Sequence, residues 1–344
     1  MSVKKNFIYN LSYQILIMIL PLITTPYISR VIGAEGIGIQ SYTYSIANYF
    51  VLFAMLGINN HGNRSIAMKR IAIQGELGSF HDITAHEYFE GEQIELICCA
   101  TFEEVFENIK RDPTVIGITA IENTIAGSLL HNYELLRQSG TTVVGEHRLH
   151  IEHSICCLPE DDWSMLQEVH SHPVALMQCG KFLANHPDLK AVEAEDTAGS
   201  AAYIAKHHVR GWAAICSSYA AQMYGMKVLQ EGIHDNPHNF TRFLVVCNPQ
   251  KAALLRPIEK ANKASIVFSL SHDKGSLSKV LTILSFYDIN LTKIQSLPNI
   301  GHEWEYLFYV DLTFDNLTRY RQSIDAITPL VKKIKVLGEY EEKE

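Results

Sequence analysis

Two long uncharged runs near the start most constrain what this chain can fold into. The run from Asn6 to Ser29 and the run from Gly36 to Asn60 contain no charged residue. Each is long enough to cross a bilayer as a helix, which takes about 20 apolar residues. Bases flank the pair, with Lys4 before it and Arg64 after it, and such bases mark cytoplasmic ends. Residues 1–67 are therefore expected to form a transmembrane helical hairpin with both ends in the cytoplasm.

The charge balance changes sign after this segment. Residues 1–67 hold four bases and one acid, a net charge of +3, so the total of −8 leaves −11 on residues 68–344. A net acidic body argues against a nucleic-acid surface, which needs clustered bases to displace counterions. It allows an anionic small substrate held by one or two arginines. The seven cysteines lack the spacing of metal ligands, so we expect buried, reduced thiols in a cytoplasmic body and no metal site.

From residue 69 onwards, short runs rich in β-branched residues alternate with helical patterns. "RIAIQG" precedes the helical "SFHDITAHEYF", "IELICCA" precedes "TFEEVFENIKR", and "VIGITAI" precedes "NTIAGSLLHNYELLRQS". The stretch "EVHSHPVALMQCGKFLANHP" is interpreted as a loop followed by a helix. This alternation predicts a layered α/β body with mostly parallel strands. In such sheets ligands bind where strand ends meet the turns, and the polar residues gather in those turns.

The end of the chain has a different pattern. Residues 263–344 follow a polar, proline-containing linker at 249–262. Their order is strand "SIVFSL", helix "KGSLSKVLTILSFYD", strands "INLTKIQSLP" and "EWEYLFYVDLTF", helix "NLTRYRQSIDAITPLV" and strand "KKIKVLGEY". This βαββαβ order predicts a ferredoxin-like domain.

Five motifs in the body resemble those of prephenate dehydratases, in their order and rough spacing. They are "GELGSF", "IENTIAGSL", "SHPVALMQC", "EDTAGSAA" and "NFTRFLVV", and the resemblance runs from Met68 to about residue 340. It implies a two-lobed α/β catalytic domain at 68–248, similar in fold to periplasmic binding proteins, and a C-terminal ACT domain at 263–344. No chorismate mutase segment is expected, because nothing before residue 68 is a charged helical bundle.

The resemblance also implies the reaction, which converts prephenate to phenylpyruvate with loss of water and carbon dioxide in phenylalanine biosynthesis. The departing hydroxyl needs a donor, and the family's T-R-F motif assigns that role to Thr241. Arg242 is expected to bind a carboxylate through its guanidinium fork. The other catalytic candidates, which offer neutral hydrogen bonds, are Asn123, Ser171 and Gln178. The substrate-binding candidates are Gly78, Ser79, Glu122, Thr197, Ser200, Asn239 and Phe243.

Some of these assignments leave alternatives open. A plain tight turn explains Gly78 and Ser79 equally well, a structural role suits Glu122, and a packing role suits His172 as well as a catalytic one. No cofactor is expected, because the reaction is neither a redox nor a phosphoryl-transfer step.

In the family the ACT domain binds phenylalanine, imposes feedback inhibition and pairs across a dimer. The family's first binding motif, G-A-L, has its counterpart here in "GSL", and the second, E-S-R-P, in "QSLP". The second motif thus has Gln295 and Leu297 in place of Glu and Arg, so effector binding or its transmission is expected to differ. The effector-binding candidates are Gly275, Ser276, Leu277, Asn290, Leu291 and Ser296. A homodimer or homotetramer formed through these domains is expected.

Within residues 1–67, the stretch "TTPYISRVIGAEGIGIQSYTYSIANYF" resembles the first two helices of polysaccharide and oligosaccharide flippases. Those transporters have many more helices, and a lone hairpin encloses no translocation path. "MKRIAIQG" resembles the natural start of a dehydratase, so Met68 is interpreted as a seam left by a gene fusion or by the joining of two reading frames. The hairpin is expected to be a passenger or, at most, an anchor that tethers a cytoplasmic enzyme to the inner face of the plasma membrane.

Two further function classes fit parts of the sequence. A binding or sensor protein for an amino acid or small anion also suits a two-lobed body with a ferredoxin-like tail. Such a protein would not need the "NFTRF" motif together with Asn123 and Ser171. A membrane component of polysaccharide transport is the other alternative, which a single hairpin does not support. Turnover of prephenate discriminates among the three.

Overall fold

The computed structural model describes residues 68–255, 258–299 and 305–342. Residues 68–344 form one compact unit. The hairpin and membrane contact expected at residues 1–67 lie outside the described residues. Over the ranges that are described, no helix is both long and apolar enough to cross a membrane.

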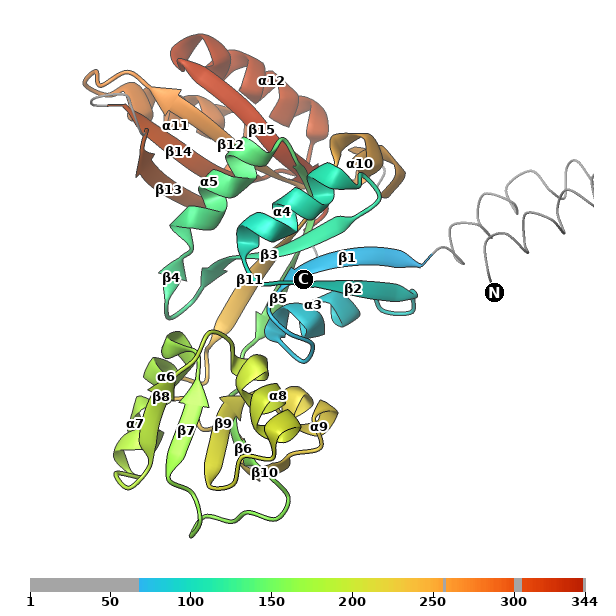
Figure 1. Ribbon diagram of the computed structural model, residues 1–344. Helices are drawn as coiled ribbons and strands as arrows, with labels where there is room; N and C mark the ends of the chain where they lie inside the picture. The colour runs from blue at the N-terminus through green and yellow to red at the C-terminus, as the bar shows by residue number, and fades with distance from the viewer. Residues whose placement is uncertain (1–67, 256–257, 300–304, 343–344) are drawn as a thin grey trace, which may run out of the picture. The chain divides into compact units, whose positions relative to one another are not determined.

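The first lobe of the unit is built on a mixed sheet with the strand order β2-β1-β3-β11-β5, to which β4 adds by pairing with β3 (Figure 1). Its strands are β1 (Lys69–Gln74), β2 (Ile94–Cys99), β3 (Ile116–Asn123), β4 (Gly127–Ser128), β5 (Thr142–His150) and β11 (Phe240–Cys247). Its helices are α3 (Phe80–Tyr88), α4 (Phe102–Arg111) and α5 (Leu130–Ser139). β1 is parallel to β2 and β3, whereas β11 is antiparallel to β3 and β5. The expected parallel pairing therefore holds for only part of this sheet.

The second lobe has a five-stranded sheet with the order β10-β6-β9-β7-β8. Its strands are β6 (Ser154–Cys157), β7 (Glu168–Ser171), β8 (Lys190–Glu193), β9 (Trp212–Cys216) and β10 (Lys227–Gln230). Its helices are α6 (Pro173–Gln178), α7 (Gly180–Ala184), α8 (Thr197–His207) and α9 (Ser218–Met223). The chain crosses between the lobes twice, from β5 to β6 and from β10 to β11.

The segment expected to be a loop before α6 is instead the strand β7. It is parallel to both β8 and β9, and its Val169 is fully buried. The sequence pattern missed this strand because only four residues take part, too few for an alternation of apolar and polar side chains to show.

The C-terminal subdomain, residues 263–340, has the predicted βαββαβ order. Its elements are β12 (Lys263–Leu270), α11 (Ser276–Phe286), β13 (Asn290–Pro298), β14 (Tyr306–Thr313), α12 (Leu317–Ile327), the short 3-10 helix η2 (Thr328–Leu330) and β15 (Lys333–Tyr340). The sheet order is β13-β14-β12-β15, and every pair is antiparallel. The segment expected to be a linker contains α10 (Pro249–Leu255) and the 3-10 helix η1 (Ile258–Lys260).

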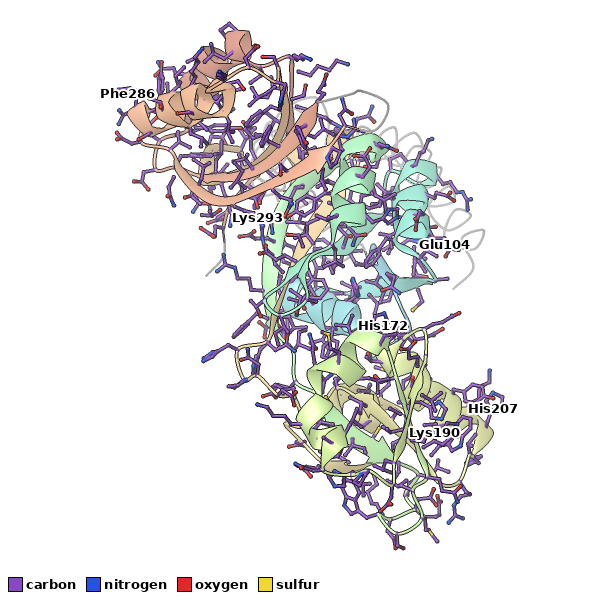
Figure 2. All side chains as sticks on the ribbon, turned by 90° about the vertical axis from the view of Figure 1, so that its left-hand side faces the viewer. Glu104, His172, Lys190, His207, Phe286 and Lys293 are labelled. Carbon is purple, nitrogen blue, oxygen red and sulfur yellow. The ribbon has the colours of Figure 1, made fainter. Side chains whose placement is uncertain are left out.

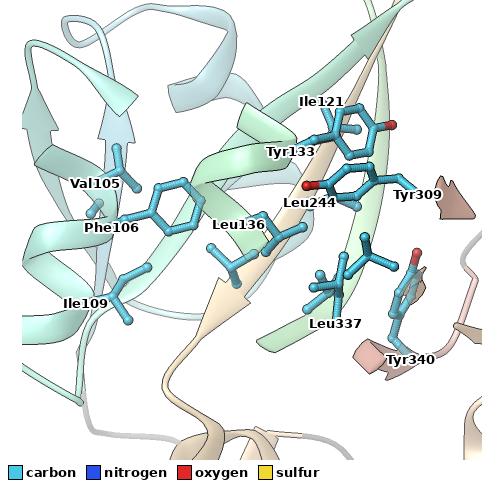
Figure 3. Packing of buried hydrophobic residues seen from close by; sticks show 14 of the residues in the cluster. Val105, Phe106, Ile109, Ile121, Tyr133, Leu136, Leu244, Tyr309, Leu337 and Tyr340 are labelled. Atoms are coloured by element: carbon cyan, nitrogen blue, oxygen red, sulfur yellow. The ribbon is translucent and has the colours of Figure 1, made fainter. Parts of the chain in front are cut away.

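One hydrophobic core is shared by the first lobe and the C-terminal subdomain (Figure 3). Tyr133 of α5 meets Tyr309 of β14 with ring centroids 5.1 Å apart, and Leu337 of β15 packs in the same cluster. A side chain at Gly338 would overlap the backbone of Val143 in β5. The C-terminal sheet is therefore packed directly against the first lobe.

Candidate active site

A cleft of about 290 Å³ is lined by residues of both lobes. The first lobe contributes Asn123 and Thr241, and the second contributes His172 and Gln178. Figure 2 shows His172 at the end of the second lobe that faces the first. The lining, as far as the structure describes it, contains no Lys or Arg. An anion in this cleft would therefore depend on neutral hydrogen-bond donors.

Three buried amide side chains close a ring of hydrogen bonds beside the cleft. Asn123 Nδ2 donates to Asn239 Oδ1 (2.8 Å), Asn239 Nδ2 donates to Gln178 Oε1 (3.0 Å), and Gln178 Nε2 donates to Asn123 Oδ1 (3.3 Å). Each of the three is at most 8% exposed. Because all three donors point the same way around the ring, the orientation of each amide depends on the other two.

Backbone N–H groups fix the direction of this ring. Asn123 Oδ1 accepts from the N–H groups of Ile125 (2.9 Å) and Ala126 (2.8 Å), which can only donate. The Nδ2 of Asn123 must then face the other way, where it also donates to Thr241 Oγ1 at 2.9 Å. Thr241 therefore accepts a hydrogen bond from the protein, and its own hydroxyl hydrogen is available to an acceptor in the cleft.

Two buried histidines in the cleft are neutral at neutral pH. Burial lowers the pKa of His81 to about 3, and its ring packs edge-on against Phe243 at a centroid distance of 4.9 Å. Burial likewise lowers the pKa of His153 to about 4, against the opposing effect of its hydrogen bond to Gln178. His153 Nε2 lies 2.9 Å from Gln178 Oε1.

Among the described residues that line the cleft, Asp196 has a half-buried carboxyl group and Glu195 an exposed one. Asp196 Oδ1 accepts from Gly199 N at 2.5 Å and caps the N-terminus of α8. Burial raises the pKa of Asp196, and the nearby Glu76 carboxylate raises it further. A substrate anion would thus meet a carboxyl group that is already harder to ionise than in water.

Thr241 and its neighbour Arg242 lie on opposite faces of the sheet. Adjacent strand residues alternate sides, and Thr241 pairs with Asn123 while Arg242 pairs with Glu122. The next residue of β11, Phe243, pairs with Ala120, so Ile121 of β3 has no partner and forms a β-bulge. The bulge places the side chains of Ile121 and Glu122 on the same face of the sheet. Asn123 and Thr241 line the cleft, whereas Glu122 forms an ion pair with Lys293 of β13 at 2.7 Å.

Arg242 does not reach the cleft, contrary to the expectation that it binds a substrate carboxylate. It is 8% exposed, and its guanidinium bonds to Asp311 of β14 (2.5 Å) and Glu146 of β5 (2.6 Å). Glu146 in turn bonds to Lys263 of β12 at 2.7 Å. Burial alone would lower the pKa of Arg242, but Asp311, Tyr340 and Glu146 hold it well above its ordinary value. The guanidinium of Arg242 is thus already bound to carboxylates of the protein itself.

Some of the other residues that the sequence predicted for the site line the cleft, and the rest stabilise the backbone near it. Ser79, Thr197 and Phe243 line the cleft with Asn123, Gln178 and Thr241. Ser171, Ser200 and Gly78 do not. Ser171 is fully buried and donates to the carbonyl of Ile215 at 2.6 Å.

Ser200 and Gly78 hold the turns around the cleft. Ser200 Oγ donates to the carbonyl of Asp196 at 2.8 Å inside the first turn of α8. Gly78 has a φ of +84°, and its N–H donates to Asp82 Oδ2 at 2.7 Å. Ser171, Ser200 and Gly78 therefore position the backbone near the cleft and do not line it.

Sequence reasoning missed His81, His153 and Asp196. His153 was missed because the sequence around it has the pattern of a continuous strand, whereas the chain crosses between the lobes there, from β5 to β6. Asp196 did carry a signal, because an Asp before "TAGSAA" is a typical helix N-cap. His81 carried none, because its environment depends on side chains from β11 and α4.

The expected effector residues lie on two elements of the C-terminal subdomain. They are Gly275, Ser276 and Leu277 at the start of α11, and Asn290, Leu291 and Ser296 in the edge strand β13. Gly275 has a φ of +78°, which favours glycine. Ser276 Oγ donates to the carbonyl of Ser271 at 3.0 Å, and Asn290 Nδ2 lies 3.4 Å from Thr313 Oγ1.

Two family models match the chain, and their matches overlap at residues 71–77, just after Met68. The model described as "Prephenate dehydratase" matches residues 71–251, and the model described as "Polysaccharide biosynthesis protein" matches residues 3–77. The resemblance of the body to prephenate dehydratases is confirmed at the level of family, and the front of the chain is similar to a polysaccharide biosynthesis protein.

Known relatives align with about four fifths of the chain. The curated protein "Arogenate dehydratase/prephenate dehydratase 6, chloroplastic" of Arabidopsis thaliana is 33% identical over 79% of this chain and 68% of its own length. A prephenate dehydratase structure from Staphylococcus aureus is 27% identical with a TM-score of 0.68, over 79% of this chain and all of the other. A structure described as a novel type of quorum quenching acylase is 25% identical with a TM-score of 0.71, over 80% and 98% of the two chains.

Proposed function

Because this chain belongs to the prephenate dehydratase family, we propose that its cleft converts prephenate to phenylpyruvate. The observation that carries the proposal is the hydrogen bond that Asn123 of the amide ring donates to Thr241 Oγ1, because it leaves the hydroxyl hydrogen of Thr241 free to be donated into the cleft. That geometry provides what the reaction needs, a positioned hydrogen-bond donor for a departing hydroxyl.

The reaction is a decarboxylative dehydration that consumes one proton. The bond from the ring to the hydroxyl breaks, and the bond to the ring carboxylate breaks with its electron pair entering the ring. Prephenate dianion and one proton thus give phenylpyruvate anion, water and carbon dioxide. Formation of the aromatic ring provides the driving force, so the protein has to assist mainly the departure of the hydroxyl.

Thr241 supplies this assistance as a hydrogen-bond donor. A threonine hydroxyl is too weak an acid to protonate the leaving group outright, so the consumed proton comes finally from solvent. Its donated bond stabilises negative charge on the departing oxygen, and positioned donors or acids of this kind contribute about 10²–10⁴-fold in rate. Asn123 Nδ2 donates a hydrogen bond to Thr241 Oγ1. Because this bond fixes the hydroxyl, the hydroxyl does not have to reorient during the reaction.

Helix N-termini are the proposed binding sites for the two substrate carboxylates. The first turns of α3 and α8 reach the cleft at Ser79 and Thr197. Each helix start has N–H groups without partners inside the helix and carries a partial positive charge. These dipoles take the place of the arginine that was expected to bind a carboxylate, and at α8 the capping carboxyl of Asp196 opposes the substrate anion.

Incubation of the purified full chain with prephenate tests the proposal directly. The expected result is formation of phenylpyruvate, measured by its absorbance in alkali, at a rate that falls at least about a hundredfold when Thr241 is replaced by Val. A parallel incubation with arogenate determines whether the amino analogue, named in the Arabidopsis relative, is also a substrate. A folded chain that converts neither compound would contradict the proposal and favour a binding or sensor protein.

We further propose that the C-terminal subdomain is an ACT domain that binds phenylalanine and inhibits the cleft. The shared element order and the Gly275 turn support this assignment. A route to the cleft is available, because Asp311 pairs with Lys293 of β13 across the sheet and binds Arg242, the residue that follows Thr241.

Steady-state rates with and without phenylalanine test this regulation, with tryptophan as the control amino acid. Inhibition is expected for the wild-type chain. Asp311→Asn should weaken the inhibition while calorimetry still detects phenylalanine binding, because the change alters the route and not the effector site. Equal inhibition in both chains would show that Asp311 does not transmit the effect of phenylalanine to the cleft. No binding of phenylalanine to the wild-type chain would show that it is not the effector.

A homodimer through the C-terminal subdomain is also proposed. Phe286, at the end of α11, is 78% exposed and borders a shallow hollow with Leu277 and Leu281. Apolar patches of this kind mark interaction surfaces. Sedimentation velocity is expected to show a dimer that Phe286→Ser weakens, and a monomeric wild type would contradict the proposal.

For residues 1–67 we propose at most an anchoring role for a cytoplasmic enzyme. Mass spectrometry of the natural N-terminus determines whether cells contain the joined chain. If they do, fractionation should place it with the plasma membrane and place a chain beginning at Met68 in the soluble fraction. Recovery of both forms in the soluble fraction would exclude the anchor.

A further inference from the structure

His153 occupies the point where the chain first crosses from one lobe to the other. It follows β5 and immediately precedes β6, it is 2% exposed, and it lines the cleft. Phe80 packs against its ring in a T-shaped contact with centroids 5.5 Å apart. The imidazole is therefore held by its surroundings and cannot swing out to water.

The amide ring decides which nitrogen of His153 carries the hydrogen. Gln178 Oε1 lies 2.9 Å from His153 Nε2, and an amide oxygen only accepts. Nε2 must therefore donate, and in the neutral imidazole Nδ1 is then a bare acceptor. Nδ1 is buried and has no hydrogen-bond partner in the part of the chain that the structure describes. A buried acceptor without a partner is unfavourable, so the site is suited to a donor brought by a ligand.

Prephenate offers one donor to such an acceptor. Its two carboxylates are ionised at neutral pH and its ketone only accepts, which leaves the ring hydroxyl. We infer that His153 orients the substrate by accepting, at Nδ1, the hydrogen bond of the ring hydroxyl, an inference that rests on the proposed dehydratase function.

This assignment gives the leaving hydroxyl two fixed partners. Thr241 donates to its oxygen and His153 accepts its hydrogen, so the carbon–oxygen bond is held in one orientation. His153 does not take up a proton, because the departing oxygen keeps the hydrogen that it donates to Nδ1. The second hydrogen of the water is the proton that comes finally from solvent, on the side of the oxygen that faces Thr241. His153 also disfavours a substrate carboxylate at this position, since a carboxylate and a bare Nδ1 are both acceptors.

A purely supporting role for His153 is the competing explanation. In that role only the Nε2 donor bond to Gln178 would matter, because it keeps the amide ring in place. Two substitutions separate the roles. His153→Gln can retain a donor near the Nε2 position but has no acceptor near Nδ1, whereas His153→Asn can present an acceptor near Nδ1 but lacks the reach of Nε2.

The experiment measures kcat and KM for prephenate with the full chain and both variants. We expect kcat/KM of His153→Gln to lie about tenfold below that of His153→Asn, the loss typical of one buried hydrogen bond. The reverse ranking would show that the bond to Gln178 is what matters and would overturn the inference. Equal values in the two variants would overturn it as well.

Inhibition by the product provides the matched control. Phenylpyruvate has lost the ring hydroxyl, so its inhibition constant should change less than about twofold in His153→Gln. An equal loss for substrate and product would indicate general damage to the cleft and would also overturn the inference. Absence of turnover in the wild-type chain would overturn the proposed function and this inference with it, whereas wild-type turnover with the wrong ranking would overturn the inference alone.

Discussion

The two faces of the β3–β11 pair differ in how they use polar side chains. On the cleft face, Asn123 and Thr241 belong to a network of neutral amides and hydroxyls. On the other face, one residue away on each strand, Glu122 and Arg242 bind charged groups of the C-terminal subdomain. Figure 2 shows Lys293, the partner of Glu122, where the C-terminal sheet meets the first lobe.

The difference follows from what each face has to do. The cleft has to exchange water for substrate, and neutral groups lose less free energy than charges when water leaves. The other face is permanently covered, so its charges have to neutralise one another. Arg242, Lys263, Glu146 and Asp311 form such a cluster, with two positive and two negative groups, each at most 9% exposed at its side chain.

The largest expected effect is on stability and comes from breaking this cluster. Arg242→Met leaves Glu146 and Asp311 as buried acids without their shared partner, which is expected to lower the free energy of unfolding by about 3–5 kcal/mol. Urea denaturation measures the loss. Arg148→Met is the matched control, because Arg148 is exposed and its contact with Glu342 is 3.5 Å long, so its loss should stay below about 1 kcal/mol. Similar losses in the two variants would show that the cluster contributes little.

The next effect is on rate and comes from the opposite face. Thr241→Val keeps the shape of the side chain but removes the hydroxyl, and kcat for prephenate is expected to fall at least about a hundredfold. Thr241→Ser retains the hydroxyl and should retain most of the rate. The urea midpoint of Thr241→Val should remain close to that of the wild type, in contrast to Arg242→Met. A near-normal kcat would exclude Thr241 from the mechanism.

The neutrality of the cleft face predicts a pH dependence of stability. The folded chain protonates His81 only near its lowered pKa of about 3, whereas the unfolded chain does so near 6.5. Between these values the unfolded chain binds more protons, so the free energy of unfolding falls as the pH falls. His81→Phe, a substitution suited to the rings of Phe102 and Phe243, should make this fall less steep. Identical slopes in chemical denaturation series at several pH values would contradict the prediction.

The smallest expected effect concerns Asp196. Asp196→Asn keeps an oxygen to cap Gly199 N but removes a charge that opposes a dianion, so KM for prephenate should fall by about two- to fivefold near neutral pH. Because burial raises the pKa of Asp196, lowering the pH should protonate the wild-type carboxyl and reduce the difference between the two chains. A KM that rises in the variant would mean that the carboxylate assists binding.

Much of the site could be predicted from the sequence, because its motifs lie at strand and helix ends. The placement of Asn123, Gln178, Thr241 and Ser79 at one cleft agrees with that prediction. Arg242 of the "NFTRF" motif was assigned to the cleft because its guanidinium can bind a carboxylate with two hydrogen bonds, but the alternation of side chains along a strand places Thr241 and Arg242 on opposite faces. Ser171 was assigned there because it lies in the "SHPVALMQC" motif and offers a neutral hydrogen bond, yet its hydroxyl satisfies the carbonyl of Ile215.

The sequence by itself determined most of the order of strands and helices, without β7 and α10, and it determined the ferredoxin-like order at the end of the chain and the family motifs. These depend on local periodicity and turn residues, which a single chain displays directly. The tertiary structure decided which face of the β3–β11 pair became the cleft. The bulge at Ile121 sets where Asn123 points, and the packing of β12 and β14 brings Lys263 and Asp311 to Arg242 and Glu146. These partners are far apart in sequence, and a buried charge is tolerated only where folding brings its counter-charge to it.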